Sequence, residues 1–246
     1  MPAPAPSPAV LAELTSAGAL RAAINMSNFL LVTGKAATGD PEGVSPDVAA
    51  EIARRLGVPL KLVPFPNPGA LADAAETGAW DIGNIGAEPQ RARIISFTAA
   101  YCEIQATYLV PAGSPIKTIA DVDCPGVRIS VTGRSAYGLW LENNIKQATL
   151  ARTDTIDSSF EKFRDQKLEA LAGLKPRLID DVTKLPGARI LDGRFSAVQQ
   201  AVGTPRKNTA AAPWLAAVIE ELKESGHIAR LIAKHQVEGL SVAPPA

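Results

Sequence analysis

Short apolar runs alternate with amphipathic segments along the first hundred residues of the chain. The apolar runs, at 20–25, 60–65 and Ile82–Ile85, have the length of buried strands. The segments between them, 45–56 and 68–77, have the boundary residues of helices, and each is followed by a glycine. A β, α, β, α, β order predicts parallel strands joined by right-handed crossovers, and therefore an α/β fold.

The first of these helices is predicted to begin at Ser45-Pro46-Asp47. The serine supplies a hydroxyl cap, the proline suits the first helical position, and the carboxylate lies at the positive end of the helix dipole. Apolar residues then recur every four positions from Val48 to Leu56, so we expect one face of the helix to pack on a sheet.

A second α/β region follows a proline- and glycine-rich break at 111–115, where the alternation starts afresh. The expected elements are strands at 127–131, 149–152 and 168–172, and helices at 136–146, 158–166 and from 176 onward. A strand at 196–202 then returns the chain to the first region, and helices at 214–224 and 227–235 close it.

This pattern predicts two lobes. The first comprises 17–109 plus 203–246, and the second comprises 110–202. The preceding stretch, 1–16, contains the run PAPAPSP, which cannot pair as a strand or continue a helix. We therefore expect 1–16 to form a flexible leader, with order beginning near Val10.

Composition excludes several classes of function. Lysine plus arginine and aspartate plus glutamate balance at 25 each, so no basic excess favours nucleic acid. No apolar run approaches the roughly 20 residues that cross a bilayer. The amino terminus lacks the basic and apolar parts of a signal peptide, which predicts that the chain as written stays in the cytoplasm. Cys102 and Cys124 are expected to be two isolated thiols.

The stretch from Trp80 to Tyr101 has the pattern of a binding edge. Its apolar run ends in the small residues Gly86 and Ala87, where backbone can approach a ligand closely, and an arginine, Arg91, follows the proline turn. An arginine after a proline turn is more often a solvated surface residue, so Arg91 is ambiguous when taken alone.

A second candidate lies at Gly133-Arg134-Ser135, between a predicted strand and a predicted helix. The free N–H groups of a helix start form a ready anion site. Ser135 is equally suited to a plain helix cap, and the two roles are compatible. Asn25 and Asn28 are expected at the end of the first strand.

Several segments together resemble the periplasmic-type solute-binding proteins that deliver amino acids to ABC transporters. They are GVSPDVAAEIARRLGV, ALADAAETGAWDIGNIGAEPQRARIISFTAAY, YLVPAGSPIKTIADVDCPGVRISVTGRSA, AVGTPRKN and ELKESGHIARL, in that order. The resemblance runs from about Leu20 to His235. It implies two α/β lobes joined by two crossing strands, as in a Venus flytrap, with a ligand in the cleft between them. Members of the family are typically periplasmic.

The resemblance also implies a binding site. Arg91 matches the arginine that grips a ligand carboxylate, Asn84 and Gly86 match flanking contacts, and Ser135 matches a contact at a helix start of the second lobe. A guanidinium fork and a helix amino terminus can both hold one carboxylate. The full set of expected ligand-binding residues is Asn25, Asn28, Asn84, Gly86, Glu88, Arg91, Arg134, Ser135 and Lys175.

This chain departs from the family pattern at three places. The acidic residue that usually receives the α-ammonium group falls at Leu174, which accepts no hydrogen bond, and the following Lys175 would repel a cation. The expected threonine is Gly86, and a stacking aromatic falls near Asn28. The ligand is therefore expected to be an anionic or neutral small molecule, unless Glu88 or Glu103 supplies the missing acid.

The sequence leaves two function classes open. The first is a binding protein that holds a small carboxylate-bearing metabolite, such as an amino acid or related organic acid, for uptake through an ABC permease or for sensing. The alternative is an enzyme resembling the cyclohexadienyl dehydratases, with Glu88, Glu103 or Lys175 as acid or base. We expect a monomer without a cofactor. His227 and His235 lack partners at ligand spacing, so no metal site is expected.

Overall fold

The computed structural model describes residues 3–246, which divide into two compact units. One unit contains the chain up to Glu103 together with Gln199–Ala246, and the other contains Ile104–Val198. Two long strands, β6 (Ile95–Val110) and β11 (Ser196–Pro205), contribute residues to both units. Met1 and Pro2, which belong to the expected leader, lie outside the described residues.

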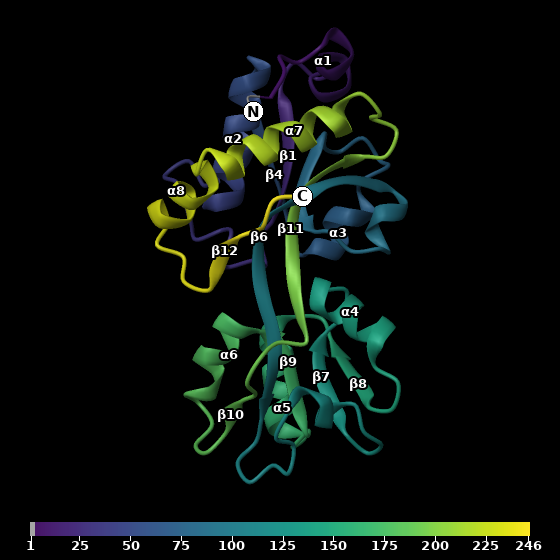
Figure 1. Ribbon diagram of the computed structural model, residues 1–246, viewed down its shortest axis with the longest axis vertical. Helices are drawn as coiled ribbons and strands as arrows, with labels where there is room; N and C mark the ends of the chain where they lie inside the picture. The colour runs from purple at the N-terminus through teal and green to yellow at the C-terminus, as the bar shows by residue number, and fades with distance from the viewer. Residues whose placement is uncertain (1–2) are drawn as a thin grey trace. The chain divides into compact units, whose positions relative to one another are not determined.

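The first unit is built on a mixed sheet with the strand order β4-β1-β5-β11-β6 (Figure 1). Strand β1 runs parallel to β4 and β5, whereas β11 runs antiparallel to β5. The other elements of this unit are α1 (Pro8–Leu14), β1 (Leu20–Asn25), β2 (Gly34–Lys35), β3 (Pro41–Glu42), α2 (Val44–Leu56), β4 (Leu60–Phe65), α3 (Pro68–Asp73), β5 (Ile82–Gly86), the 3-10 helix η1 (Arg91–Arg93), α7 (Ala211–Glu224), α8 (His227–Lys234) and β12 (Leu240–Val242).

The apolar runs of the sequence become the buried strands of this sheet. The first two strands have the predicted bounds, 20–25 and 60–65, and they pair in register from Leu20 with Leu60 to Asn25 with Phe65. On one face, Ala23 and Ile85 pack with Trp80 and with helix α3 in a buried core. Because β1 and β5 are parallel neighbours, the residues that follow them emerge at the same edge of the sheet.

The predicted start of helix α2 is wrong by two residues. Gly43 is the N-cap, with φ 150°, and a β-carbon there would overlap the carbonyl oxygen of Leu31. Ser45 lies inside the first turn, where its N–H donates to that carbonyl over 3.1 Å and its hydroxyl lies 3.4 Å from the same oxygen. The close approach of two backbone segments selects the glycine, and capping propensity does not register such a contact. Gly57 ends the helix in the left-handed conformation, as predicted.

The expected flexible leader is replaced over much of its length by a packed helix. Helix α1 begins at Pro8 with Ser7 as its N-cap, and it buries Val10 and Leu14. It packs against α7, and the carbonyl of Pro4 accepts a 2.9 Å hydrogen bond from the indole of Trp214. The composition of PAPAPSP does not show that a long-range partner fixes the segment in place.

The second unit contains a sheet with the strand order β6-β9-β7-β8, and β10 also pairs with β6 (Figure 1). Strand β7 is parallel to β8 and β9, and β6 is antiparallel to β9. Its elements besides β6 are the 3-10 helix η2 (Ile119–Val122), β7 (Arg128–Thr132), α4 (Ala136–Asn144), β8 (Thr149–Thr153), α5 (Ile156–Asp165), β9 (Ala170–Leu174), α6 (Lys175–Val182) and β10 (Arg189–Ile190).

The order of strands and helices predicted for this unit agrees with the structure, with shifts of one to two residues at most ends. Its core contains Leu109 from β6, Leu171 from β9 and the phenylalanines of α5. The two-residue strand β10 has too short a pattern to be recognised from sequence. None of the helices within 3–246 has the length and hydropathy that a bilayer span requires. Cys102 and Cys124 are both free, as expected, with Cys102 buried and Cys124 exposed.

Candidate functional site

The end of strand β1 is shaped by two asparagines. The side-chain oxygen of Asn25 accepts hydrogen bonds from the N–H of Ser27, at 3.2 Å, and from its hydroxyl, at 2.8 Å. The side-chain oxygen of Asn28 accepts from the N–H of Leu30 at 3.2 Å. Both are buried and both stabilise the turn that follows the strand. The structure thus gives Asn25 and Asn28 a local structural role, and their contact with a ligand stays a prediction.

Strands β5 and β11 place two amide side chains inside the first unit. Val202 lies opposite Asn84, and Gln200 lies opposite Gly86. Because side chains alternate between the two faces of a strand, Asn84 and Gln200 project from the same face, and Gly86 has no side chain between them. Asn84 is 1% exposed and Gln200 is 4% exposed.

Three of the side-chain atoms of these amides have no visible partner. Neither side-chain atom of Asn84, nor the side-chain oxygen of Gln200, has a hydrogen-bond partner among residues 3–246. Leaving a buried polar group unpaired costs about 1–3 kcal/mol. A polar group of a ligand that reached these atoms would therefore find hydrogen-bonding partners in place. Sequence analysis singled out Asn84 but missed Gln200, which only the pairing of β11 with β5 brings to the same face.

Arg91 is buried, which excludes the solvated surface role that its position in a turn would allow. It is 4% exposed, and its Nη1 donates a 2.7 Å hydrogen bond to the carbonyl oxygen of Gly86 at the end of β5. The backbone turn is held by the carbonyl of Glu88, which accepts from the N–H groups of Arg91 and Ala92, both at 3.0 Å. This turn directs the guanidinium back to the edge of the sheet.

A half-buried carboxyl group lies near this arginine. Burial raises the pKa of Glu88 to about 7, and the nearby charge of Arg91 opposes the shift without cancelling it. Glu88 therefore changes charge near neutral pH, next to the arginine that we expect to bind a carboxylate. Glu103, the other candidate for the missing acid, is half-buried on β6 and accepts a 2.8 Å hydrogen bond from the amide of Gln199.

In the second unit, Ser135 caps helix α4. Its hydroxyl oxygen accepts from the N–H of Gly138 at 3.0 Å, and the hydroxyl donates to the carbonyl of Thr132 at 2.7 Å. A β-carbon on Gly138 would lie 2.5 Å from that carbonyl and 2.9 Å from the hydroxyl, so glycine is required for this tight turn. Arg134, just before the cap, is exposed and has a φ of 58°. Such left-handed non-glycine residues occur often at functional sites.

Hydroxyl groups fill the space behind this turn. The Tyr137 hydroxyl donates to the Thr132 hydroxyl at 3.0 Å, and the Thr132 hydroxyl lies 2.9 Å from that of Ser159. Tyr137 is 4% exposed and belongs to the buried core, and burial raises its pKa. Trp140, on the same helix, packs against Phe195 with ring centroids 5.3 Å apart. The network fixes the strand end from which the turn departs.

The α6 start contains no acid, as the sequence indicates, and the buried acid near the other end of this helix is already paired. Leu174 ends β9 and serves as the N-cap of α6, and the half-buried Lys175 is the first residue of the helix. Near the end of the helix, Asp181 is 1% exposed, and both of its oxygens lie 3.0 Å from Nε of Arg177. Lys184 also donates to Asp181 at 2.9 Å.

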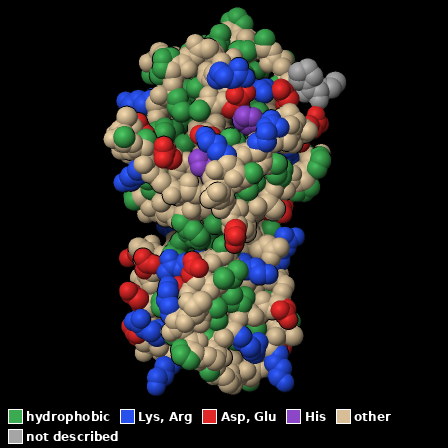
Figure 2. Space-filling model, turned by 90° about the vertical axis from the view of Figure 1, so that its left-hand side faces the viewer, with side chains coloured by type: hydrophobic (Ala, Val, Ile, Leu, Met, Phe, Trp, Pro, Cys, Tyr) green, Lys and Arg blue, Asp and Glu red, His purple; other side chains and the backbone are tan. Residues whose placement is uncertain are grey.

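The structure therefore brings together Asn84, Gly86, Glu88 and Arg91 in the first unit and Arg134 with Ser135 in the second. Within the described part of the chain, no group of three or more His, Cys, Asp or Glu side chains is arranged to hold a metal ion. Over the face shown in Figure 2, acidic and basic side chains are interspersed.

Solved structures of solute-binding proteins share this fold. The P235GK mutant of ArgBP from T. maritima is 24% identical, with a TM-score of 0.69 over 93% of this chain and 100% of that chain. A putative binding component of an ABC transporter from Wolinella succinogenes, complexed with lysine, is 20% identical, with a TM-score of 0.72 over 88% and 95%. The ancestral amino acid-binding protein AncCDT-1, a precursor of cyclohexadienyl dehydratase, is 20% identical, with a TM-score of 0.71 over 91% and 98%.

These likenesses define a two-lobe solute-binding fold, as the sequence predicted. The chain belongs to the bacterial extracellular solute-binding proteins, family 3, whose family model matches residues 24–238. The expectation of a binding protein, in preference to an enzyme, is confirmed at the level of the family. AncCDT-1, which relates to the dehydratase alternative, is itself an amino acid-binding protein and a precursor of such an enzyme. No curated protein sequence matches the chain.

Proposed function

We propose that this solute-binding protein holds a small carboxylate-bearing metabolite and that Arg91 binds the carboxylate. The observation that carries the proposal is a buried guanidinium hydrogen-bonded to Gly86, a residue that lies opposite Gln200 and two positions from Asn84. Both amide atoms of Asn84 and the amide oxygen of Gln200 lack a partner within residues 3–246. A guanidinium has five N–H donors in a fixed plane that matches a carboxylate. The adjacent amides would hydrogen-bond a further polar group of the ligand.

The ligand class follows from the charges of this edge. Similar proteins include one complexed with lysine, so amino acids belong in the candidate set together with keto acids and other organic acids. Ionised Glu88 is the group that could receive an ammonium group, whereas protonated Glu88 favours an anion or a neutral polar molecule. We further propose delivery to an ABC permease, or sensing, as the use of the bound ligand. Contacts by Arg134, Ser135 and Lys175 also stay predictions.

Thermal-shift screening tests the carboxylate proposal. Purified protein is mixed with amino acids, keto acids, dicarboxylates and aromatic acids. A ligand at 100 times its dissociation constant should add about 2.7 kcal/mol of stability. Arg91→Ala should abolish the shift, and Arg91→Lys, which retains charge without the planar fork, should reduce it. Arg93→Ala is the matched control, since Arg93 lies exposed in the same short helix. An undiminished shift in a folded Arg91→Ala protein would refute the proposal.

Asn84→Leu separates a binding role from a structural one. Leucine has a similar size and removes two buried atoms that lack a protein partner. The unfolding temperature without ligand should therefore stay the same or rise, while affinity for the ligand found in the screen falls. A lower unfolding temperature with unchanged affinity would show that the amide serves the fold alone.

A further inference from the structure

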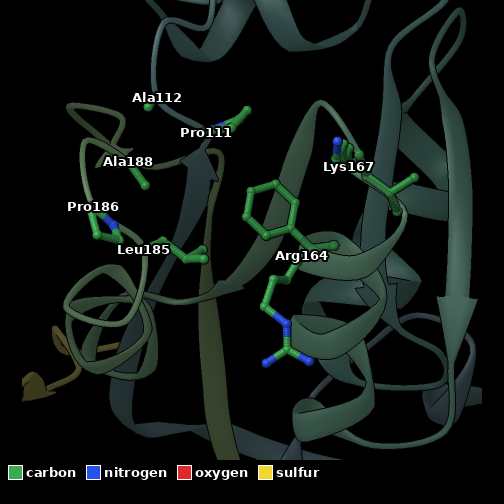
Figure 3. Close-up of a pocket in the computed structure, with 9 residues that line it drawn as sticks. Pro111, Ala112, Arg164, Lys167, Leu185, Pro186 and Ala188 are labelled. Carbon is green, nitrogen blue, oxygen red and sulfur yellow. The ribbon is translucent and has the colours of Figure 1, made fainter.

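The second unit contains a cavity of about 300 Å³ that none of the expected ligand-binding residues lines (Figure 3). Its walls come from three segments: 111–112 after β6, 163–168 at the end of α5, and 185–188 between α6 and β10. It is about twice the 150 Å³ of a cavity that can hold benzene. The cavity is therefore large enough for a ligand that contains a ring or a chain of several carbons.

The walls are held in place by backbone contacts. Gly187 has a φ of 78°, and a β-carbon there would lie only 2.9 Å from that of Ala112, so these two walls meet directly. The guanidinium of Arg189 donates a hydrogen bond to the carbonyl of Ile116, which follows the lining segment 111–112 in the chain. Its strand, β10, pairs with the end of β6. The cavity is therefore a fixed feature of the unit and does not depend on a loose loop.

The lining is largely apolar. Phe163 and Leu168 are each 2% exposed and belong to the core of the unit, and Leu185 and Ala188 pack against that core. A cavity with this lining favours the apolar part of a ligand over water. Within residues 3–246, no carboxylate lines the cavity, and its two charged residues, Arg164 and Lys167, are both cationic.

Lys167 supplies the positive charge that remains available at the rim. The guanidinium of Arg164 pairs with Asp165 at 2.6 Å and lies 5.8 Å from the Phe160 ring centroid. In Figure 3 the Arg164 side chain extends away from Pro111 and Ala112. The exposed Lys167 makes no ion pair within the described chain, and its backbone is fixed in the left-handed region, with φ 47°. Its carbonyl accepts a 2.9 Å hydrogen bond from Arg128, which helps to hold that conformation.

We propose that this cavity is a second binding site, specific for amphipathic carboxylic acids with an apolar body of about eight carbons. The apolar body lies against Phe163, Leu168 and Ala188, and the carboxylate pairs with the ammonium group of Lys167. Charge complementarity selects the anion, since the rim offers only cations and the interior offers no hydrogen-bonding carboxylate. This site is independent of the proposed role of Arg91.

Methyl NMR of the full chain tests this assignment with octanoate as the probe. Leucine methyl groups are labelled with carbon-13, and octanoate is titrated into the millimolar range. Saturable shifts are expected at Leu168 and Leu185, and these localise binding to the cavity, while Leu71 in the first unit serves as an internal reference. Octanoate should bind more tightly than 1-octanol, and octyltrimethylammonium should bind most weakly. The absence of saturable shifts, or equal binding of all three compounds, would overturn the proposal.

Substitutions at two positions, Lys167 and Ala188, examine charge and volume separately. Lys167→Asn removes the charge and Lys167→Asp reverses it, and both residues tolerate a left-handed backbone, so the fold should be kept. Octanoate should bind about fivefold more weakly to the aspartate variant, with 1-octanol unaffected. Lys61→Asp, at an exposed strand position of the first unit, is the matched control. Ala188→Phe should fill the cavity and abolish all three titrations. Unchanged octanoate affinity in Lys167→Asp would contradict the role of the lysine.

Discussion

The burial of Arg91 makes its surroundings as important as its charge. A guanidinium that is 4% exposed has lost most of its contact with water, and its 2.7 Å hydrogen bond to the carbonyl oxygen of Gly86 replaces part of that contact. Any change in charge nearby acts through a medium that screens it poorly. The half-buried Glu88 is the residue best placed to make such a change.

Binding of a carboxylate should weaken as pH rises through about 7, the pKa to which burial raises Glu88. Above that pH, ionised Glu88 adds a negative charge near Arg91 and competes with the ligand. We expect affinity to fall about fivefold between about pH 6 and about pH 8, measured by calorimetry with a ligand that does not itself titrate there. Glu88→Gln should make the affinity independent of pH over this range.

Glu88 should also make the folded protein less stable as pH rises through neutrality. The pKa of Glu88 is higher in the folded protein than its ordinary value of 4.5, so the folded state holds the proton more tightly. The contribution of protonated Glu88 to the free energy of unfolding is fully present below about pH 4.5 and is lost as pH rises through about 7. Glu76→Gln, at an exposed position, is the control. An unaltered pH dependence of binding in Glu88→Gln would assign the effect to another group.

At the level of elements, helix α7 is capped by a residue from a distant helix. Its N-cap, Ala210, offers no side chain for capping. Instead, the carboxylate of Glu13 accepts from the N–H of Ala210, at 3.1 Å, and of Ala211, at 2.7 Å. A carboxylate at this end also interacts favourably with the helix dipole. Residues near the start of the chain thus complete a helix that begins at Ala211.

Glu13→Ala should lower the free energy of unfolding by about 1 kcal/mol, the usual effect of losing a cap. In a protein of this size the unfolding temperature should fall by about 2–4 °C, which a thermal melt followed by circular dichroism would measure. Glu13→Gln keeps an acceptor oxygen and should lose less. Glu76→Ala is the exposed control, and an equal decrease in both alanine variants would show that α7 does not depend on this cap.

The local pattern of apolar and turn residues is sufficient to predict some helices and strands but not others. The runs at 20–25 and 60–65 gave strands with the right ends because apolar spacing and flanking turn residues coincide there. The start of α2 depends on the close backbone approach of Gly43 to Leu31, and α1 depends on packing against α7. Both contacts join residues that are separated in sequence, so no window along the chain contains the information.

At the level of the whole molecule, the two units differ in how the chain builds them. The second unit is one continuous segment, Ile104–Val198, with its own sheet and its own core. The first unit combines the start of the chain with its end. Continuous segments with a separate core are the ones that fold on their own.

A fragment spanning residues 104–198 should therefore fold in isolation. We expect a far-UV circular dichroism spectrum with helix and strand signals and one cooperative thermal transition. A fragment of residues 3–103 lacks β11, the strand that lies between β5 and β6, and should remain largely unfolded. A random-coil spectrum for fragment 104–198 would show that its stability depends on the remainder of the chain.

The candidate site could be predicted from sequence only in outline. Arg91 and Asn84 were found because they lie in a continuous segment that resembles the family. Gln200 was missed because it is more than one hundred positions away and reaches the same face only through strand pairing. The sequence alone also does not predict that Arg91 is buried and Arg93 is exposed. Which of the two is buried depends on which side of the short helix η1 faces the sheet.

The position of β11 between β5 and β6 has a consequence for biosynthesis. While the chain is being made, both neighbouring strands exist long before the segment from Gln199 to Pro205 leaves the ribosome. Until then the nascent first unit has two unpaired strand edges, which can associate with other chains. Translation pauses or truncations before residue 199 should therefore yield aggregation-prone products, and holding chaperones would be needed for this unit more than for the other.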